Sequence, residues 1–294
     1  MGMCIDRASQ NKYGFLSLIR DQLDLPKWLP IEAEFQIGWE IALDEMNKRK
    51  YNLIWSRRIQ NHFSKSGFKA HILENPFIYY RNKNNIKQNE SASGTVVFPY
   101  HSDEGWLVDL DIKDFCSRLE SLSKIFKPIT ICLHFLDYIN DDVRKAYEEY
   151  FNVVTAGDIY DKAFVQKFYG ILSENKYSTS NAISTYTFYS INMGIPFFIT
   201  EVPFKTINRQ QSNIEGVGSK RKLLIYPEYQ KAFHLFNSHD KNKITPQQIE
   251  YVKEEMGLCI TNNTNLIKLN LFIFGIIKLL KTQIKKNIRI KQIR

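Results

Sequence analysis

One stretch decides the fold: Lys176-Tyr-Ser-Thr-Ser-Asn-Ala-Ile-Ser-Thr-Tyr-Thr-Phe-Tyr-Ser-Ile-Asn-Met-Gly-Ile-Pro-Phe-Phe-Ile-Thr200. Its pattern predicts a hydroxyl-rich loop, a helix entered through small polar residues, a Gly-Ile-Pro turn and a short apolar strand. A helix N-terminus offers backbone N–H groups and a partial positive charge, so the loop side chains of Ser178, Thr179, Ser180 and Asn181 suit a phosphate. These residue types also cap ordinary helices, so the stretch alone leaves both interpretations open.

The sequence before this stretch alternates regularly between strand and helix patterns. Apolar strands are predicted over residues 95–98, 129–135 and 152–155. Helices are predicted after each of them, over about 111–126, over 141–150 and after Asp161 as a cap. Alternation of this kind indicates a parallel sheet with right-handed crossovers. We therefore predict an α/β fold with a Rossmann-like parallel-sheet domain.

The N-terminal third shows a shorter α/β pattern. Strands are predicted over 51–56 and 68–73, with a helix over 57–66 between them that ends at Gly67. A further helix is predicted to end over residues 44–50. The polar run Arg81–Gly94 is the best linker in the chain. We predict a short N-terminal α/β part over residues 1–90, a Rossmann-like domain over 91–260 and an apolar-basic tail over 261–294.

Composition bounds the class of protein. The chain has 294 residues, of which 44% are hydrophobic and 24% charged, as in soluble globular proteins. Its cysteines (Cys4, Cys116, Cys132 and Cys259) lie far apart without a C-x-x-C pair. This spacing predicts reduced thiols in the cytoplasm. The first twenty residues have no apolar segment of the kind that a signal peptide needs, so we expect none.

The positive charge belongs to the tail. Of the net charge of +9, eight units come from Lys and Arg between Met256 and Arg294, where there is no Asp or Glu, which leaves +1 for the rest. A nearly neutral body argues against a nucleic-acid groove.

The uncharged run Leu269–Ile277 is too short to cross a bilayer, which takes about 20 residues. Apolar residues beside basic ones predict a helix in the interface of an anionic membrane; the alternative is that the apolar residues pack on the N-terminal part.

Polar residues gather after the predicted strands, where ligands bind in open parallel sheets. The segments concerned are Tyr100–Gly105, Leu136–Tyr138, Ala156–Tyr160, Ser178–Asn181 and Glu201–Pro203. Their hydroxyl groups and glycines predict a nucleotide or sugar-phosphate site, and they do not specify the reaction.

The order of these motifs resembles a known family. His101-Ser102, then Thr155-Ala-Gly157, then Ser178-Thr-Ser-Asn and Met193-Gly-Ile-Pro196 resemble the C-terminal half of GT-B glycosyltransferases. Upstream, Trp55-Ser-Arg-Arg, Ser66-Gly-Phe68 and Glu74-Asn-Pro76 look like the close of the N-terminal domain in enzymes of bacterial surface-polysaccharide assembly. The likeness covers roughly residues 50–237. It implies that residues 1–90 are a shortened acceptor-side part and that residues 91–260 are the nucleotide-sugar-binding domain.

The resemblance implies a nucleotide-sugar donor bound without metal or cofactor. It implies that His101 and Ser102 face the donor phosphates or sugar. It places the base at Gly157, Asp158 and Tyr160, and the diphosphate at Ser180, Asn181, Ser184 and Thr185. The sugar would go to a lipid-linked or polysaccharide acceptor at the inner face of the cytoplasmic membrane.

Two departures from the family leave alternatives open. About 90 residues are too few for a complete N-terminal Rossmann unit. Ile37 stands at the position where the resemblance would place a histidine base, so the only catalytic candidate is His101. The alternatives to a glycosyltransferase are a nucleotide-sugar epimerase or glycerophosphotransferase of the same fold, and a non-catalytic scaffold.

Other patterns favour structural roles. Asp109-Leu-Asp111 matches a metal-binding D-x-D string, but its place at a predicted helix start favours a cap. Asp240–Glu250 lacks the glycine of an EF-hand loop. Ser184 has no nucleophile elbow. The histidines other than His101 are isolated in sequence, and we interpret them as packed or surface residues (His62, His71, His134, His234 and His239).

Overall fold

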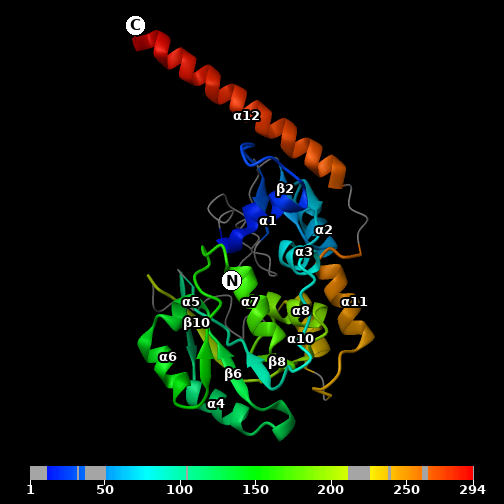
Figure 1. Cartoon of the computed structure of the whole chain (residues 1–294), viewed down its shortest axis with the longest axis vertical. Helices are drawn as coiled ribbons and strands as arrows, with labels where there is room; N and C mark the ends of the chain where they lie inside the picture. Colours follow the sequence, from blue (N-terminus) through cyan, green and yellow to red (C-terminus); the bar gives the residue numbers. More distant parts are fainter. Residues whose placement is uncertain are drawn as a thin grey trace.

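A computed structural model describes residues 12–31, 33–36, 51–103, 105–210, 226–237, 240–259 and 264–293. The predicted helix over 44–50, Ile37, Cys4 and His239 lie outside the described residues. Figure 1 shows a large sheet with its helices at one end, a smaller α/β unit in the middle, and a long C-terminal helix projecting from the other end.

The N-terminal unit contains a small parallel sheet, as predicted. Its strands run in the order β1 (Glu34–Phe35), β2 (Asn52–Ile54) and β3 (Ala70–Ile72), with helices α1 (Phe15–Gln22), α2 (Arg57–Lys65) and α3 (Pro76–Lys83). Ser56 caps α2 by accepting a hydrogen bond from the Ile59 N–H, and Asn75 caps α3 by accepting one from the Phe77 N–H. Each cap satisfies a backbone donor that the first helical turn leaves without a partner.

The second sheet has five parallel strands. They are β4 (Thr95–Val97), β6 (Ile129–Cys132), β7 (Asn152–Val154), β8 (Tyr177–Ser180) and β9 (Phe197–Ile199), in the spatial order β7-β6-β4-β8-β9. Counted along the chain, this order is 3-2-1-4-5, as in the doubly wound Rossmann fold, and it reverses direction between β4 and β8. The predicted α/β fold class is confirmed: a Rossmann-like parallel sheet follows a smaller N-terminal α/β part, while the GT-B likeness stays a prediction.

Helices cover both faces of this sheet. On one face, Val97 and Ile131 pack with α4 (Ile112–Glu120) and α6 (Asp141–Glu148). On the other, Val96 and Cys132 belong to the large core that contains α7 (Phe164–Ser173), α8 (Thr185–Asn192) and α10 (Pro227–Phe236). Neighbouring residues of a strand point to opposite faces, which explains why apolar residues stand next to each other in β4 and β6. The short helices α5 (Phe135–Tyr138) and η3 (Lys124–Phe126) lie in the connections.

The structure corrects three local predictions. Ser178, Thr179 and Ser180 are not in a loop, because they lie in β8. Asp109 is not at a helix start, because Trp106–Leu110 forms a strand, β5, that pairs antiparallel with β10 (Phe204–Asn208). Asp161 does not cap α7, whose N-cap is Ala163; the Asp161 carboxylate accepts from the Ala163 N–H at 2.8 Å and pairs with Lys167 at 2.7 Å.

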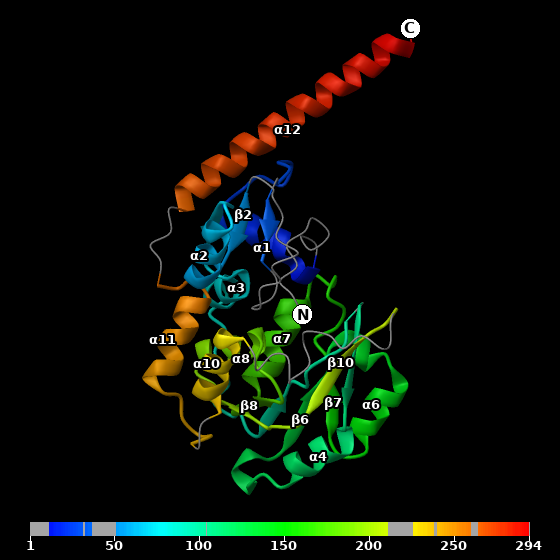
Figure 2. The same cartoon turned by 180° about the vertical axis from the view of Figure 1, so that it is seen from behind.

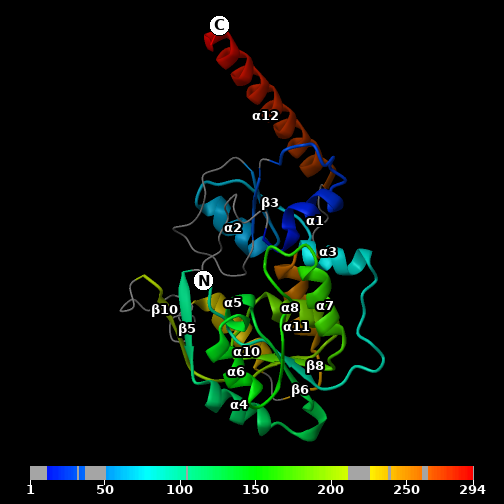
Figure 3. The ribbon, with the colours of Figure 1, turned by 60° about the vertical axis from the view of Figure 1, so that its left-hand side comes forward.

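The predicted linker is ordered. Its first residues, 81–83, end α3, and the rest packs on the end of α7, where the Asn89 N–H donates to the Ser173 carbonyl at 2.9 Å. The Gln88 side chain donates to the Asn175 carbonyl at 2.8 Å. Figure 3 shows this segment passing down one side of the molecule from α3 to the five-stranded sheet. The domain boundaries themselves stay a prediction.

Two C-terminal helices contact the N-terminal unit. The predicted capping box opens α11 (Pro246–Glu255), which contacts both α8 and α2. Glu255 accepts two hydrogen bonds from the Arg58 guanidinium, at 2.8 and 2.9 Å. Beyond it, α12 (Thr264–Ile293) starts against the N-terminal unit and projects from the body (Figure 2). Among the described helices, including α12, none is both long and apolar enough to cross a membrane.

Candidate functional site

A cavity of about 170 Å³ lies where β4, β6 and β7 end and α8 begins. It therefore adjoins the position where the strand order reverses, which is the usual ligand site of an open parallel sheet. Tyr13, Phe15 and Phe77 of the N-terminal unit line it from the opposite side. The cavity is thus formed by both units of the chain.

Aromatic rings form much of its wall. Tyr13 meets Phe164 with ring centroids 4.8 Å apart, and Phe77 stacks on Tyr189 at 5.1 Å. Phe98 stacks on Tyr186 at 5.3 Å. Rings that pack on one another hold a rigid apolar surface, which suits a planar or apolar part of a ligand.

Two histidines supply polar groups at the same cavity. His101, after β4, stacks on His134, after β6, with ring centroids 4.1 Å apart and planes 13° apart. The Nδ1 atom of His101 lies 2.9 Å from the Ser102 carbonyl oxygen, which can only accept, so Nδ1 carries the proton of this contact. His134 Nδ1 accepts from the Leu136 N–H at 3.4 Å, so the neutral ring carries its proton on Nε2. His134, which is isolated in sequence, is a packed residue in the structure, and the ring that it packs against is His101.

His134 is neutral at physiological pH. Burial lowers the pKa of His134 to about 2, and repulsion from His101 and Lys12 adds to the effect. Cys132 also lines the cavity, and burial raises the pKa of its thiol to about 12, so the thiol stays protonated. Both cavity groups are therefore fixed in their neutral forms.

The N-terminus of α8 faces the cavity from the third side. Ser184 is the N-cap and Thr185 the first helical residue, and both line the cavity. The Ser184 N–H donates to the Thr187 hydroxyl at 3.4 Å. Thr185 donates a hydrogen bond to the buried Tyr189 hydroxyl, which also accepts from Asn75. A helix N-terminus with flanking hydroxyls is the environment in which proteins bind phosphate groups.

The loop after β7 contributes its backbone. Gly157 lines the cavity with a φ of +92°, a conformation that side chains disfavour, and its N–H donates to the Thr155 hydroxyl at 3.1 Å. The other two predicted base contacts, Asp158 and Tyr160, are not among the lining residues. Asp158 accepts from the Tyr160 N–H, and the Tyr160 side chain is 51% exposed.

Four predicted ligand residues are buried away from the cavity. Thr179 donates to the Phe198 carbonyl at 2.7 Å, Ser178 to the Pro196 carbonyl at 3.2 Å, and Ser180 bonds to the Tyr186 hydroxyl at 2.8 Å. Asn181 accepts from the Tyr100 N–H at 2.8 Å, which joins the ends of β8 and β4. The structure brings His101, Gly157, Ser184 and Thr185 together and gives these four residues structural partners.

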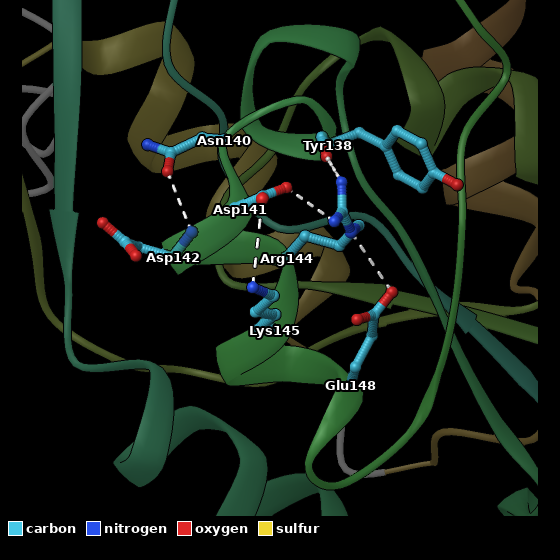
Figure 4. A network of polar contacts seen from close by, with 7 residues as sticks. All are labelled: Tyr138, Asn140, Asp141, Asp142, Arg144, Lys145 and Glu148. Carbon is cyan, nitrogen blue, oxygen red and sulfur yellow. Dashed lines mark hydrogen bonds and ion pairs between the residues drawn. The ribbon is translucent and has the colours of Figure 1, made fainter.

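Ser102 supports His101 from behind. Its N–H donates to the buried carboxylate of Asp137 on α5 at 3.0 Å, and its hydroxyl accepts from the Val108 N–H at 3.1 Å. Figure 4 shows how Arg144 fixes the end of α5: the guanidinium donates to the Tyr138 carbonyl at 3.0 Å and pairs with Asp141 and Glu148. Arg144 thus anchors Tyr138, which follows Asp137 in α5, and Asp137 accepts the N–H of Ser102, the residue after His101.

Of the acidic pair Asp109 and Asp111, only Asp111 lies at the start of α4, where it caps the helix as predicted. Asp111 accepts from the Asp114 N–H at 2.9 Å as the N-cap of α4, and Asp109 lies in β5 opposite Lys205. Within the described ranges, no group of three or more His, Cys, Asp or Glu side chains could hold a metal ion.

Comparisons with known proteins give a distant likeness. No protein-family model matches the chain, and no curated protein does. The solved structure of UDP-GlcNAc 2-epimerase from Neisseria meningitidis bound to UDP-GlcNAc is similar to 70% of this chain, at 15% identity and a TM-score of 0.34. A variant of the wall teichoic acid polymerase TagF is similar to 81%, at 13% identity and a TM-score of 0.35. The matched part is 60% of each of those chains.

Proposed function

We propose that this chain is a glycosyltransferase that moves a sugar from a nucleotide-sugar donor to a lipid-linked or polysaccharide acceptor in surface-polysaccharide synthesis. One observation carries the proposal: the cavity at the strand-order reversal has the N-terminus of α8 on one side and the His101–His134 pair on another. Both groups suit the negative charge of a diphosphate. The aromatic wall and the Gly157 backbone suit the base or sugar of the donor.

These groups would act on the leaving diphosphate. In the transfer, the bond between the anomeric carbon and the diphosphate oxygen breaks, the acceptor oxygen bonds to that carbon, and the acceptor proton passes to a base. Negative charge grows on the diphosphate as its bond breaks. The N–H groups of α8, the hydroxyls of Ser184 and Thr185, and the Nε2–H of His134 are preorganised donors for that charge. His101 is the catalytic candidate: its Nδ1–H donates to the Ser102 carbonyl, so its imidazolium form, protonated on both nitrogens, would donate to the same diphosphate through Nε2. The proposal needs no metal.

The proposed acceptor implies where in the cell the enzyme would work. A lipid-linked acceptor is presented at the membrane surface, so the enzyme would work as a cytoplasmic protein that attaches peripherally to the inner face of the membrane.

The small N-terminal sheet favours one other candidate function, a non-catalytic scaffold that retains only donor binding. The reason is that the acceptor-side unit, as far as the structure describes it, has three short strands.

The test is donor-dependent product formation. The purified chain is incubated with UDP-, GDP-, CMP- and dTDP-sugars that carry an isotope label in the sugar, with and without a membrane lipid extract or polysaccharide. Mass spectrometry should find the label on the acceptor for at least one donor. A sugar that isomerises without acceptor would identify an epimerase instead, while a donor that binds and stays intact with every acceptor would identify a scaffold.

A further inference from the structure

Seven leucine and isoleucine side chains form an exposed stripe along α12. Each is 40 to 59% exposed, and successive members are three or four residues apart (Leu266, Leu269, Ile273, Ile277, Leu280, Ile284 and Ile288). This spacing places them on one face of the helix. At 1.5 Å per residue, the stripe is about 33 Å long. An apolar surface of this length on a soluble protein indicates a binding face.

The opposite face of α12 is already occupied by the protein body. Ile267 and Leu271 are buried, and Gly275 lies so close to the body that a Cβ atom there would be 2.6 Å from the Leu29 side chain. Lys268 pairs with Asp24 at 2.9 Å, and Asn270 donates to the Tyr51 hydroxyl at 3.4 Å. These contacts fix the helix to the N-terminal unit and leave the stripe facing outward.

The charges beside the stripe select its partner. Lys281 and Lys285 are exposed on the projecting half of α12, three or four residues from members of the stripe, and the chain has no Asp or Glu after Glu255. Two copies that met along the stripe would bring like charges together without acidic partners on the helix. An anionic lipid surface, in contrast, neutralises the lysines and accepts apolar side chains at the boundary of its headgroups and acyl chains.

We infer that α12 lies flat in the interface of an anionic bilayer, with the stripe inserted and the opposite face still seated on the N-terminal unit. Its first half is therefore both the joint to the body and part of the membrane contact, and the second half extends the contact beyond the body (Figures 1 and 2). This inference goes beyond the proposed transfer reaction, because it needs neither nucleotide nor acceptor.

The experiment is co-sedimentation of the full chain with vesicles, without any nucleotide. We compare phosphatidylcholine vesicles with vesicles that also contain phosphatidylglycerol. The double variant Leu280→Glu, Ile284→Glu places two carboxylates on the stripe. The matched control, Thr282→Glu with Gln283→Glu, makes the same change in charge at neighbouring exposed positions off the stripe. We expect the stripe variant to bind anionic vesicles at least about tenfold more weakly than the control, because it also loses two large apolar contacts. Added salt should release the wild type.

Three results would overturn the inference. If both variants bind anionic vesicles equally, the stripe does not insert into the bilayer. If the wild type binds both vesicle types equally, the lysines do not contribute by attraction to anionic lipid. The third is a wild-type dimer, seen by sedimentation velocity without vesicles, that the stripe variant dissociates; the stripe would then bind a second copy. Circular dichroism checks that both variants keep their helix content.

Discussion

His134 is the residue whose environment differs most from what the sequence indicated. It follows a buried strand, stacks on His101 and accepts the Leu136 N–H, so burial and geometry fix one tautomer. Its pKa of about 2 keeps the ring neutral. A neutral ring with its proton on Nε2 is a hydrogen-bond donor at every physiological pH, which is the role proposed for it beside a diphosphate.

The lowered pKa makes folding stability depend on pH. The pKa of His134 is about 2 in the folded chain and about 6.5 in the unfolded chain, so below pH 6.5 the unfolded chain takes up the proton first. The stabilisation is therefore complete above pH 6.5 and decreases as the pH falls. Between pH 7 and pH 5 the loss approaches about 2 kcal/mol. Urea unfolding at both pH values should show the wild type losing stability relative to His134→Gln.

The control is His234→Gln, an exposed histidine on α10, which should follow the wild type at both pH values. The assignment fails if the gap in unfolding free energy between the wild type and His134→Gln is the same at pH 7 and pH 5.

The strand β8 shows why hydroxyl-rich sequence can mislead. Tyr177-Ser-Thr-Ser180 has a loop-like composition, yet it is a central strand between β4 and β9. Its hydroxyls donate to neighbouring carbonyls, as Thr179 does to Phe198, and this satisfies polar groups that burial would otherwise penalise. Such partners come from distant parts of the chain, so composition alone could not reveal them. The helix that follows was predictable, because a cap acts within one turn.

The contact between α12 and the N-terminal unit can be tested by substituting two helical glycines, Gly275 in α12 and Gly170 in α7. A Cβ atom added to Gly170, in α7, would meet nothing within 4 Å, whereas a Cβ atom on Gly275 would be 2.7 Å from the Pro30 carbonyl oxygen. Alanine in a helix is favoured over glycine by about 1 kcal/mol. Gly170→Ala should therefore stabilise the chain, and Gly275→Ala should loosen α12 from the N-terminal unit despite the same gain in propensity.

Hydrogen exchange measures both effects, through the amides of α12 and of the core strands. If the amide hydrogens of residues 264–276 exchange faster in Gly275→Ala, but not in Gly170→Ala, the result supports the contact between α12 and the N-terminal unit. Unchanged exchange there would mean that the body does not hold α12 at this glycine.

The cavity depends on how the two units meet. Its N-terminal wall comes from Tyr13, Phe15 and Phe77, which carry no motif and lie far along the chain from the helices α7 and α8 that they meet, so this wall could not be predicted. The strand ends that supply His101 and Gly157 were predicted, since parallel strands bring their carboxyl ends to one edge. Arg58 and Glu255 connect the N-terminal unit to α11, which also contacts α8, so this ion pair is part of the contact between the two units.

The most direct test of the proposed site is calorimetric titration with nucleoside diphosphates in excess EDTA, using the wild type, Ser184→Ala with Thr185→Ala, and Ser178→Ala. We predict that at least one nucleotide binds the wild type without metal. The double variant should bind it at least about tenfold more weakly, because hydrogen bonds to charged groups contribute about 1.5–3 kcal/mol each. Ser178→Ala should bind like the wild type, since this hydroxyl lies in β8 and donates to Pro196. Binding that requires magnesium or manganese, equal affinity of the double variant, or no binding of any nucleotide would contradict the account.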